Sequence, residues 1–248
     1  TIHNLRFQGT WNVGHLQYVS RLPHEVFEPT KLVSPFQDTS LPKSDWTASM
    51  LRGGLVYSDW ITTVSNSYAY EIQTPQFSDG LDDILRCRNQ RLKGIVNGLD
   101  YQIWNPETDT NIAETYNVEN FIAKRNANKI ALQKELGLDP DPSVFTLGIV
   151  SRLTDQKGLD LVDQIMDQLC ETRINLVVLG TGDAHYENMF RHYQSKYPNK
   201  IAAIIGYSEE LSHRIYAGVD ALLVPSAFEP CGLTQLISLR YGTVPIVH

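Results

Sequence analysis

The fold is decided by the stretch VFTLGIVSRLTDQKGL at residues 144–159. Its first seven residues form a short apolar run rich in β-branched side chains, which predicts a strand. A polar loop follows, and the segment 159–169 after it carries apolar residues at nearly helical spacing. We therefore expect a strand, a loop and a helix in that order, which is the repeating unit of α/β folds.

The same alternation continues to the last residue. Apolar runs predict four further strands, at 174–179, 201–205, 221–224 and 244–247. The segments between them predict helices that end near Lys196 and that span 209–216 and 233–240. Because the strands are apolar throughout, they indicate a parallel sheet covered on both faces. We expect a doubly wound, Rossmann-like unit that binds ligands at the carboxyl ends of its strands.

The first half of the sequence is less regular. Its pattern predicts helices at 49–57 and 68–72, strands at 60–64 and 91–96, and a long helix at 120–136 that Gly137 closes. We place a domain junction near Asn97, so that residues 1–96 belong to one domain and 97–248 to the next. The turn at 139–142 is a second candidate junction.

Composition excludes several classes of protein. The 248 residues are 42% apolar and 20% charged, which is typical of globular chains, and the net charge of -7 argues against nucleic-acid or anionic membrane partners. Three widely spaced cysteines indicate neither a disulfide framework nor a zinc site. We expect a cytoplasmic protein. The threonine at position 1 and the strand-like ending at 244–248 lead us to expect a fragment cut at both ends.

The loop after the first regular strand holds two cations, Arg152 and Lys157. Both lie at the ligand-bearing edge of the predicted sheet, where an arginine fork and a lysine point charge could hold a diphosphate. The alternative is a solvated loop with two surface cations.

A second cluster, FEPCGLT at 228–234, joins a carboxylate to the start of a helix. The free N–H groups of a helix N-terminus bind phosphate, and Gly232 permits close approach. Glu229 could then hydrogen-bond sugar hydroxyls beside that phosphate. The alternative is an acidic residue that only favours the helix dipole.

Weaker signals lie nearby. Gly180 begins a strand-to-helix turn that is not a full dinucleotide motif, and Tyr207 follows the third strand, where it could stack on a base or simply edge the core. His3, at the end of a probable strand, has a structural alternative. Cys231 is not a convincing nucleophile, because no histidine lies near it in the sequence.

Taken together, four segments resemble bacterial glycogen synthase and plant starch synthase. These segments are TIHNL at 1–5, VNGLDYQIWNP at 96–106, SRLTDQKG at 151–158 and FEPCGLTQL at 228–236. The resemblance covers the whole chain in order and spacing. It implies the GT-B fold, an α/β fold in which two Rossmann-like domains face each other across a cleft, and both domains would be incomplete here.

The resemblance also implies an activity. Members of the family transfer glucose from ADP-glucose to the non-reducing end of an α-1,4-glucan with retention of configuration, and they need no metal or other cofactor. Arg152 and Lys157 would neutralise the diphosphate, while Glu229 and His3 would act on the donor sugar, so these four are the expected catalytic residues. The expected substrate-binding residues are Asn97, Gly180, Tyr207, Cys231, Gly232, Leu233 and Thr234.

The sequence also departs from the family pattern. The Lys-Thr-Gly-Gly-Leu donor loop of the family is absent, and Ile237 stands where a related superfamily has a second glutamate. Two alternatives therefore remain open. One is another GT-B transferase that uses UDP-glucose, and the other is a glucan- or nucleotide-binding remnant without catalysis.

Overall fold

The computed structural model describes residues 1–248. The chain divides into two compact units, Thr1–Asn97 and Gly98–His248, and each is described by itself. None of the helices is both long and apolar enough to cross a membrane.

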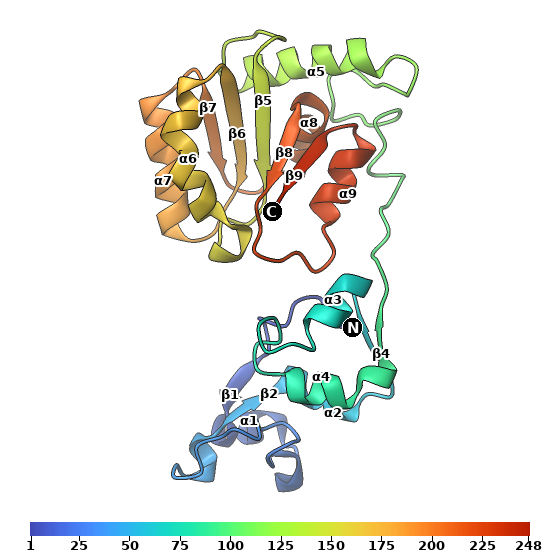
Figure 1. Cartoon of the computed structure of the whole chain (residues 1–248), viewed down its shortest axis with the longest axis vertical. Coiled ribbons are helices and arrows are strands. Elements are labelled where there is room, and N and C mark those ends of the chain that lie inside the picture. The colour runs from blue at the N-terminus through green and yellow to red at the C-terminus, as the bar shows by residue number, and fades with distance from the viewer. The chain divides into compact units, whose positions relative to one another are not determined.

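The second unit is built on a five-stranded parallel sheet with the strand order β7-β6-β5-β8-β9 (Figure 1). The strands are β5 (Phe145–Val150), β6 (Ile174–Gly180), β7 (Ile201–Ile205), β8 (Ala221–Val224) and β9 (Val244–Val247). All five predicted strands are thus confirmed. The chain builds outward from β5 to β7 and then crosses to β8 on the other side of β5. Loops that leave neighbouring strands in opposite directions make the ligand-binding switch point of such sheets.

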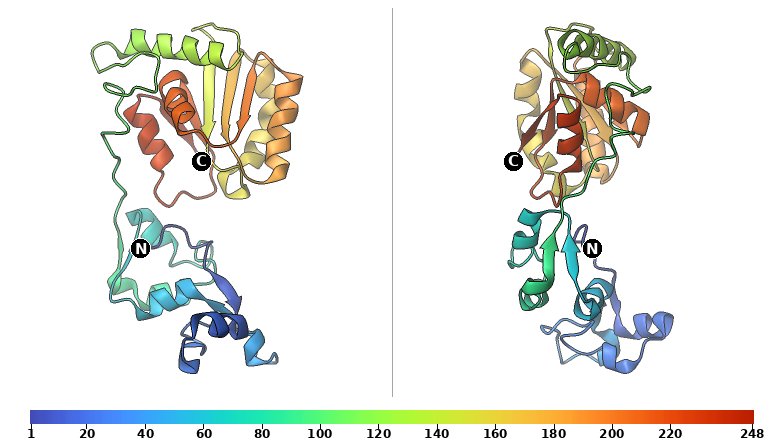
Figure 2. Two further views of the ribbon diagram at one scale, coloured as in Figure 1. Left: turned by 180° about the vertical axis from the view of Figure 1, so that it is seen from behind. Right: turned by 90° about the vertical axis from the view of Figure 1, so that its right-hand side faces the viewer.

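Helices cover both faces of this sheet (Figures 1 and 2). They are α5 (Phe121–Glu135), α6 (Leu159–Glu171), α7 (Ala184–Lys196), α8 (Glu209–Gly218) and α9 (Leu233–Arg240), with a short 3-10 turn, η4, at Asp155–Lys157. Side chains of α6 and α7 build one hydrophobic core, and those of α5, α8 and α9 build the other. Gly137, with φ +70°, follows the end of α5 in the left-handed conformation, as the sequence predicts.

Strand β6 shows why the sheet is buried on both sides. Leu176 and Val178 pack in the core beneath α6 and α7, whereas Val177 and Leu179 pack in the opposite core. Successive side chains of a strand point to opposite faces, so a run without polar residues requires cover on each face. This two-faced burial is the physical basis of the apolar pattern in the sequence.

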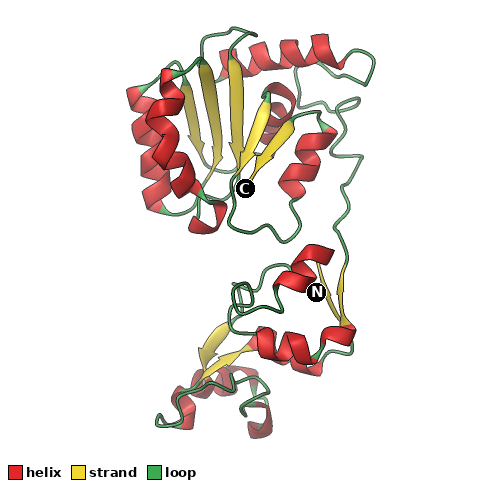
Figure 3. Cartoon of the chain, viewed as in Figure 1, coloured by secondary structure: helices red, strands yellow, loops and turns green.

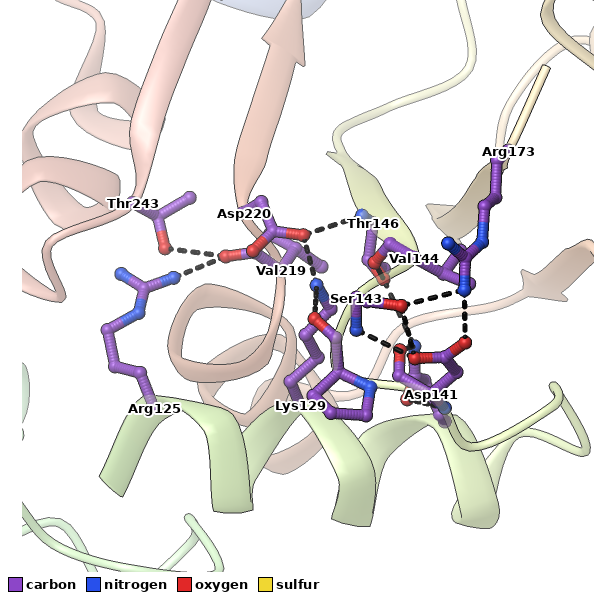
Figure 4. A network of polar contacts seen from close by, with 12 residues as sticks. Arg125, Lys129, Asp141, Ser143, Val144, Thr146, Arg173, Val219, Asp220 and Thr243 are labelled. Atoms are coloured by element: carbon purple, nitrogen blue, oxygen red, sulfur yellow. Dashed lines mark hydrogen bonds and ion pairs between the residues drawn. The ribbon is translucent and has the colours of Figure 1, made fainter. Parts of the chain in front are cut away.

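The amino ends of the strands are held by a polar network around α5 (Figure 4). The Lys129 ammonium lies 2.6 Å from Asp220 Oδ2 and donates to the Pro142 carbonyl at 3.0 Å. Asp220 Oδ2 also accepts from the Thr146 amide at 2.7 Å, and this bond fixes the start of β5 beside that of β8. The network is on the edge opposite to the switch-point loops.

The first unit has short elements joined by long loops, as the colouring of Figure 3 shows. Its strands are β1 (Thr10–Asn12) and β2 (Thr47–Ser49), which pair antiparallel, and β3 (Ile61–Thr63) and β4 (Leu92–Gly94), which pair parallel. Its helices are α1 (Val13–Ser20), α2 (Met50–Tyr57), α3 (Asn66–Glu71) and α4 (Asp82–Cys87), with 3-10 turns η1 (His24–Val26), η2 (Lys43–Asp45) and η3 (Asn89–Arg91).

The sequence predictions for this unit were less accurate. The predicted strand before His3 is wrong, because Ile2 makes only an isolated bridge with Thr63. The predicted strand at 91–96 shortens to three residues, and helices α1 and α4 were not predicted. Short elements offer too few residues for a periodic pattern, and α1 begins instead at a cap in which the Asn12 side chain accepts from the His15 amide.

Candidate active site at the switch point

The site begins where the loops after β5 and β8 meet. The Gln156 side chain donates to the Phe228 carbonyl at 3.2 Å, and the Ala227 amide donates to the Gln156 carbonyl at 3.0 Å. Gly158 has φ +64°, and a Cβ there would overlap the Pro225 carbonyl oxygen. Glycine at this position therefore allows the two loops to be in contact, and this contact brings Lys157 next to the FEPCGLT segment.

Lys157 and Glu229 form an ion pair at this junction. The Lys157 ammonium lies 2.5 Å from Glu229 Oε1, and the two side chains are 16% and 21% exposed. The Ser226 hydroxyl donates to the same oxygen at 2.7 Å. Two donors from two loops thus orient the Glu229 carboxylate. One of them, Lys157, is 72 positions away from Glu229 in the sequence.

A cavity of about 330 Å³ opens beside the pair. Four predicted site residues line it: Arg152, Gly180, Tyr207 and Thr234. Tyr207 is 86% exposed, so it is not a core-edge residue. Thr234 also lines the smaller neighbouring pocket that contains Lys157 and Glu229. The structure therefore brings six of the predicted residues to one edge of the sheet.

Helix α9 begins at this edge. Its N-cap, Gly232, has φ +77°, and no side chain caps the first turn. Uncapped N–H groups and the helix dipole make this turn attractive to an anion. Cys231 and Leu233 flank the cap but line neither pocket, and Leu233 is 40% exposed.

The turn that contains Gly180 has a structural reason for its glycines. A Cβ on Gly180 or Gly182 would overlap carbonyl oxygens of the loop after β5. The Gly182 amide donates to Glu187 at 3.0 Å, and this bond, with that of Thr181, lowers the pKa of Glu187. Because the Gly182 amide already donates to Glu187, the turn does not offer this amide to a phosphate.

His3 and Asn97 belong to the first unit. His3 is exposed and follows Ile2, whose carbonyl accepts a hydrogen bond from the Thr63 hydroxyl at 2.9 Å. Asn97 is half-buried and is the last residue of the unit.

Sequence reasoning missed three residues of the second unit. Ser226 orients Glu229, Gln156 clamps the two loops, and Trp104 forms part of the cavity wall. The position of Ser226, two residues after the end of a strand and three residues before a glutamate, was a signal in the sequence. No group of three or more histidine, cysteine, aspartate or glutamate side chains is arranged to hold a metal ion.

Comparison with known proteins shows which families and solved structures this chain is similar to. The starch synthase catalytic domain family matches residues 1–87, and the group 1 glycosyl transferase family matches residues 129–248. The chain is 54% identical to glycogen synthase of Lachnospira eligens and 51% identical to that of Lachnoclostridium phytofermentans, in both cases over its whole length and 50% of theirs. The catalytic domain of starch synthase IV from Arabidopsis thaliana, solved with ADP and acarbose bound, is 33% identical with a TM-score of 0.88. That alignment covers 99% of this chain and 49% of the other.

These similarities define an α/β protein of the GT-B glycosyltransferase class. More narrowly, the chain belongs to the family of glycogen and starch synthases. It spans about half the length of the curated relatives that it matches.

Proposed function

We propose that the protein is a retaining glucosyltransferase that moves glucose from ADP-glucose to the non-reducing end of an α-1,4-glucan. The observation that carries the proposal is the Lys157–Glu229 pair, which lies at the uncapped start of α9 and beside a cavity at the switch point. The resemblance to glycogen synthases and the ADP and acarbose bound to the starch synthase relative support the same donor and acceptor classes.

The chemistry requires a cationic site for the leaving group. When the bond between the anomeric carbon and the β-phosphate oxygen breaks, negative charge develops on ADP. Arg152, Lys157 and the N–H groups of α9 would stabilise that charge more in the transition state than in the ground state. These fixed charges would supply what a metal ion supplies in other transferases.

Lys157 would serve two partners. An ammonium has three N–H donors, so Lys157 can keep its bond to Glu229 and still donate to a phosphate oxygen. Glu229, already oriented by Ser226, would accept hydrogen bonds from the donor sugar hydroxyls. Cys231, Gly232, Leu233 and Thr234 would contact the sugar and phosphate through the backbone of the turn.

The nucleotide base would occupy the cavity. Tyr207 has a largely exposed ring on the cavity rim, and stacking of a base on an aromatic ring contributes about 1–3 kcal/mol. Gly180 would lie beside the base. Most of the cavity wall is apolar side chain, which suits a flat heteroaromatic ring.

Retention of configuration fits a front-side displacement. Ile237 occupies the position of the superfamily's second glutamate, so that position offers no second carboxylate for a double displacement. The acceptor hydroxyl would attack the anomeric carbon on the face that ADP leaves. Its proton would pass to the departing phosphate oxygen, so that bonds and charges balance.

The remaining assignments rest on the family resemblance. They are a sugar-binding role for His3 and Asn97, a cytoplasmic location, and the domain division at residues 96 and 97. Under that division, residues 1–96 are the last part of the N-terminal catalytic domain, and 97–248 are the hinge and first part of the C-terminal domain.

The decisive test is a glucose incorporation assay. Radiolabelled ADP-glucose and UDP-glucose are each offered with glycogen, to the 248-residue chain and to a protein with the full length of its relatives. We expect incorporation from ADP-glucose by the longer protein. A preference for UDP-glucose would support the other transferase class. Binding of ADP without incorporation by either protein would support a non-catalytic remnant.

A further inference from the structure

A buried polar cluster lies behind the cavity. Asp109 Oδ2 lies 2.7 Å from His213 Nδ1 and 2.5 Å from the Tyr241 hydroxyl. The Asp109 and His213 side chains are 1% and 2% exposed, and Tyr241 is fully buried. The three residues come from the segment before α5, from α8 and from the end of α9, so the cluster ties three parts of the second unit together.

Asp109 is the acceptor at the centre of this cluster. Burial would raise the pKa of Asp109, but hydrogen bonds from His213, Tyr241 and the Asn111 amide outweigh burial and hold that pKa below its ordinary value. A carboxylate cannot donate, so His213 carries its proton on Nδ1 and Tyr241 donates its hydroxyl hydrogen. The bonding scheme therefore fixes both the tautomer and the plane of the imidazole.

The imidazole in turn supports Trp104. The two rings stack with centroids 4.1 Å apart and planes 16° apart. Trp104 also meets Tyr216 edge to face, with centroids 5.8 Å apart. Trp104 and Tyr216 both line the cavity, together with Arg152, Tyr207 and Thr234.

The segment that carries Trp104 is anchored at further points. Asn105 accepts from Arg240 at 2.9 Å, and the Tyr116 hydroxyl donates to the Tyr241 carbonyl at 2.8 Å. Both anchors hold the segment to the end of α9, the helix whose first turn faces the pocket of Lys157 and Glu229. One wall of the cavity is thus a chain segment outside the sheet, held by these hydrogen bonds and by packing of Trp104 against the hydrophobic core.

We propose that Asp109, His213 and Tyr241 are positioning residues for the nucleotide. They hold Trp104 in place as a wall of the cavity and thereby set the affinity for a nucleoside diphosphate. The proposal rests on the proposed function, because it takes the cavity to be the base-binding site. None of the three residues touches the reacting atoms, so their loss changes binding more than turnover.

Asp109→Asn is the most informative variant. The amide keeps the size of the carboxylate, but its N–H₂ group takes the place of either Oδ2, where it faces both the Nδ1–H of His213 and the Tyr241 hydroxyl, or Oδ1, where it faces the Asn111 amide. In either orientation a buried donor is left without its acceptor and the acceptor of His213 loses its negative charge, so the imidazole is held less firmly and gives Trp104 less support. The loss of one charge-assisted bond corresponds to a decrease of about tenfold in ADP affinity.

The experiment measures the Kd of ADP by calorimetry, and the KM and kcat for the sugar nucleotide, in the full-length enzyme. We expect Asp109→Asn to raise Kd and KM about tenfold and to change kcat less than about twofold. Trp104→Ala should raise Kd at least as much, and Trp104→Phe, which keeps an aromatic wall, should recover part of the affinity. Trp104 is the only tryptophan in residues 98–248, and Trp11, Trp46 and Trp60 lie in the first unit, so an emission change that ADP causes at this cavity should be much smaller in Trp104→Phe.

Asp220→Asn is the matched control, since it removes another hydrogen-bonded carboxylate at the opposite edge of the same sheet. It should lower the Tm and leave the Kd unchanged, because a general loss of stability reduces active enzyme without altering affinity. If Asp109→Asn does not fold, Tyr241→Phe removes a single hydroxyl and should raise Kd about threefold.

Wild-type affinity for ADP in Asp109→Asn or Tyr241→Phe would overturn the proposal, and so would equal effects of Asp109→Asn and Asp220→Asn on Kd. Failure of the wild-type enzyme to bind ADP at all would overturn the proposed function, and this inference with it. The two failures are thus distinguished by the wild-type titration.

Discussion

Two of the lysine–carboxylate pairs of the second unit lie at opposite edges of one sheet. Lys129 meets Asp220 at 2.6 Å at the amino edge, and Lys157 meets Glu229 at 2.5 Å at the carboxyl edge. The distances are nearly the same, and each carboxylate also accepts a second hydrogen bond through the same oxygen. What differs is the kind of partner that surrounds each pair.

At the amino edge the partners are fixed backbone groups. Lys129 is 6% exposed and donates to the Pro142 carbonyl, and Asp220 accepts from the Thr146 amide (Figure 4). At the carboxyl edge the pair adjoins a cavity and an uncapped helix start. An ion pair whose other hydrogen-bond partners are backbone groups stabilises the fold. An ion pair that lies beside a cavity and the uncapped N–H groups of a helix is available to a ligand.

The largest expected effect is on activity at the carboxyl edge. In the full-length enzyme, Glu229→Gln or Lys157→Ala should lower kcat about 1000-fold, equivalent to about 4 kcal/mol, because each removes a fixed charge next to the leaving group or the sugar. The Tm should fall less than in Asp220→Ala, because the Lys157 side chain is 16% exposed whereas the Lys129 side chain is 6% exposed. Initial rates of glucose transfer and thermal unfolding curves check both expectations.

The contrast between the two edges would be contradicted if Glu229→Gln and Lys157→Ala lost stability and kept the wild-type turnover. Such a result would make Lys157 and Glu229 a second structural pair. Ser226→Ala is the graded control, since it removes one donor to Glu229 and leaves both charges in place, so its kcat should lie between those of the wild type and Glu229→Gln.

The amino edge should show the opposite response. Asp220→Ala leaves the buried Lys129 ammonium without its counter-charge and should cost about 3 kcal/mol of unfolding free energy. Lys129→Met should cost less, because the remaining carboxylate is 32% exposed and keeps its bond to the Thr146 amide. Denaturant titration measures both, and equal losses would contradict the asymmetry. The KM for the donor should stay at the wild-type value in each.

The next variant tests whether the contact between the loops after β5 and β8 maintains the site at the carboxyl edge. Gly158→Ala places a Cβ against the Pro225 carbonyl oxygen at a positive φ, which should cost about 2 kcal/mol and separate the two loops. Both stability and turnover should then fall together. Gly137→Ala is the matched control, because that glycine also has a positive φ but no atom lies within 4 Å of its Cβ position. Loss of turnover in both variants would show that the effect is not local to the loop contact.

The sequence predicts the second unit well for a physical reason. Strands β5 to β8 supply side chains to both hydrophobic cores and are separated by helices with clear spacing, so local pattern and tertiary burial agree there. The edge strand β9 is apolar in sequence but largely exposed. In the first unit, strands β1 to β4 have three residues each, and pairings such as Thr10 with Ser49 join distant segments. Three residues cannot establish a period, so the sequence does not reveal β1 and β2, and it predicts β3 and β4 only as the longer strands 60–64 and 91–96.

The candidate site divides in the same way. The positions of Arg152, Lys157 and Glu229 follow from topology, since loops after parallel strands meet at one edge. The ion pair and the stack of Trp104 on His213 depend on side-chain rotamers and on contacts between residues over 70 positions apart. The bond from Ser226 to Glu229 is local, but it too depends on rotamers. The hydrophobic pattern of the sequence does not indicate which side chains make such contacts, so only the folded structure shows them.

The smallest expected effect concerns charge at the amino edge, and it depends on pH. Hydrogen bonds from Ser143 and the nearby Arg173 hold the pKa of Asp141 below its ordinary value of 3.8. A carboxylate with a lowered pKa stabilises the folded state above its unfolded pKa, and this contribution disappears as the pH falls through the folded value. Asp141→Asn keeps the acceptor oxygen for Ser143 and removes the charge together with the acceptor of Arg173. Its Tm should therefore lie slightly below that of the wild type at pH 7, the two should converge below about pH 3, and turnover at pH 7 should be unchanged. A Tm difference that persists unchanged in acid would show that the geometry of the side chain, and not its charge, stabilises this edge.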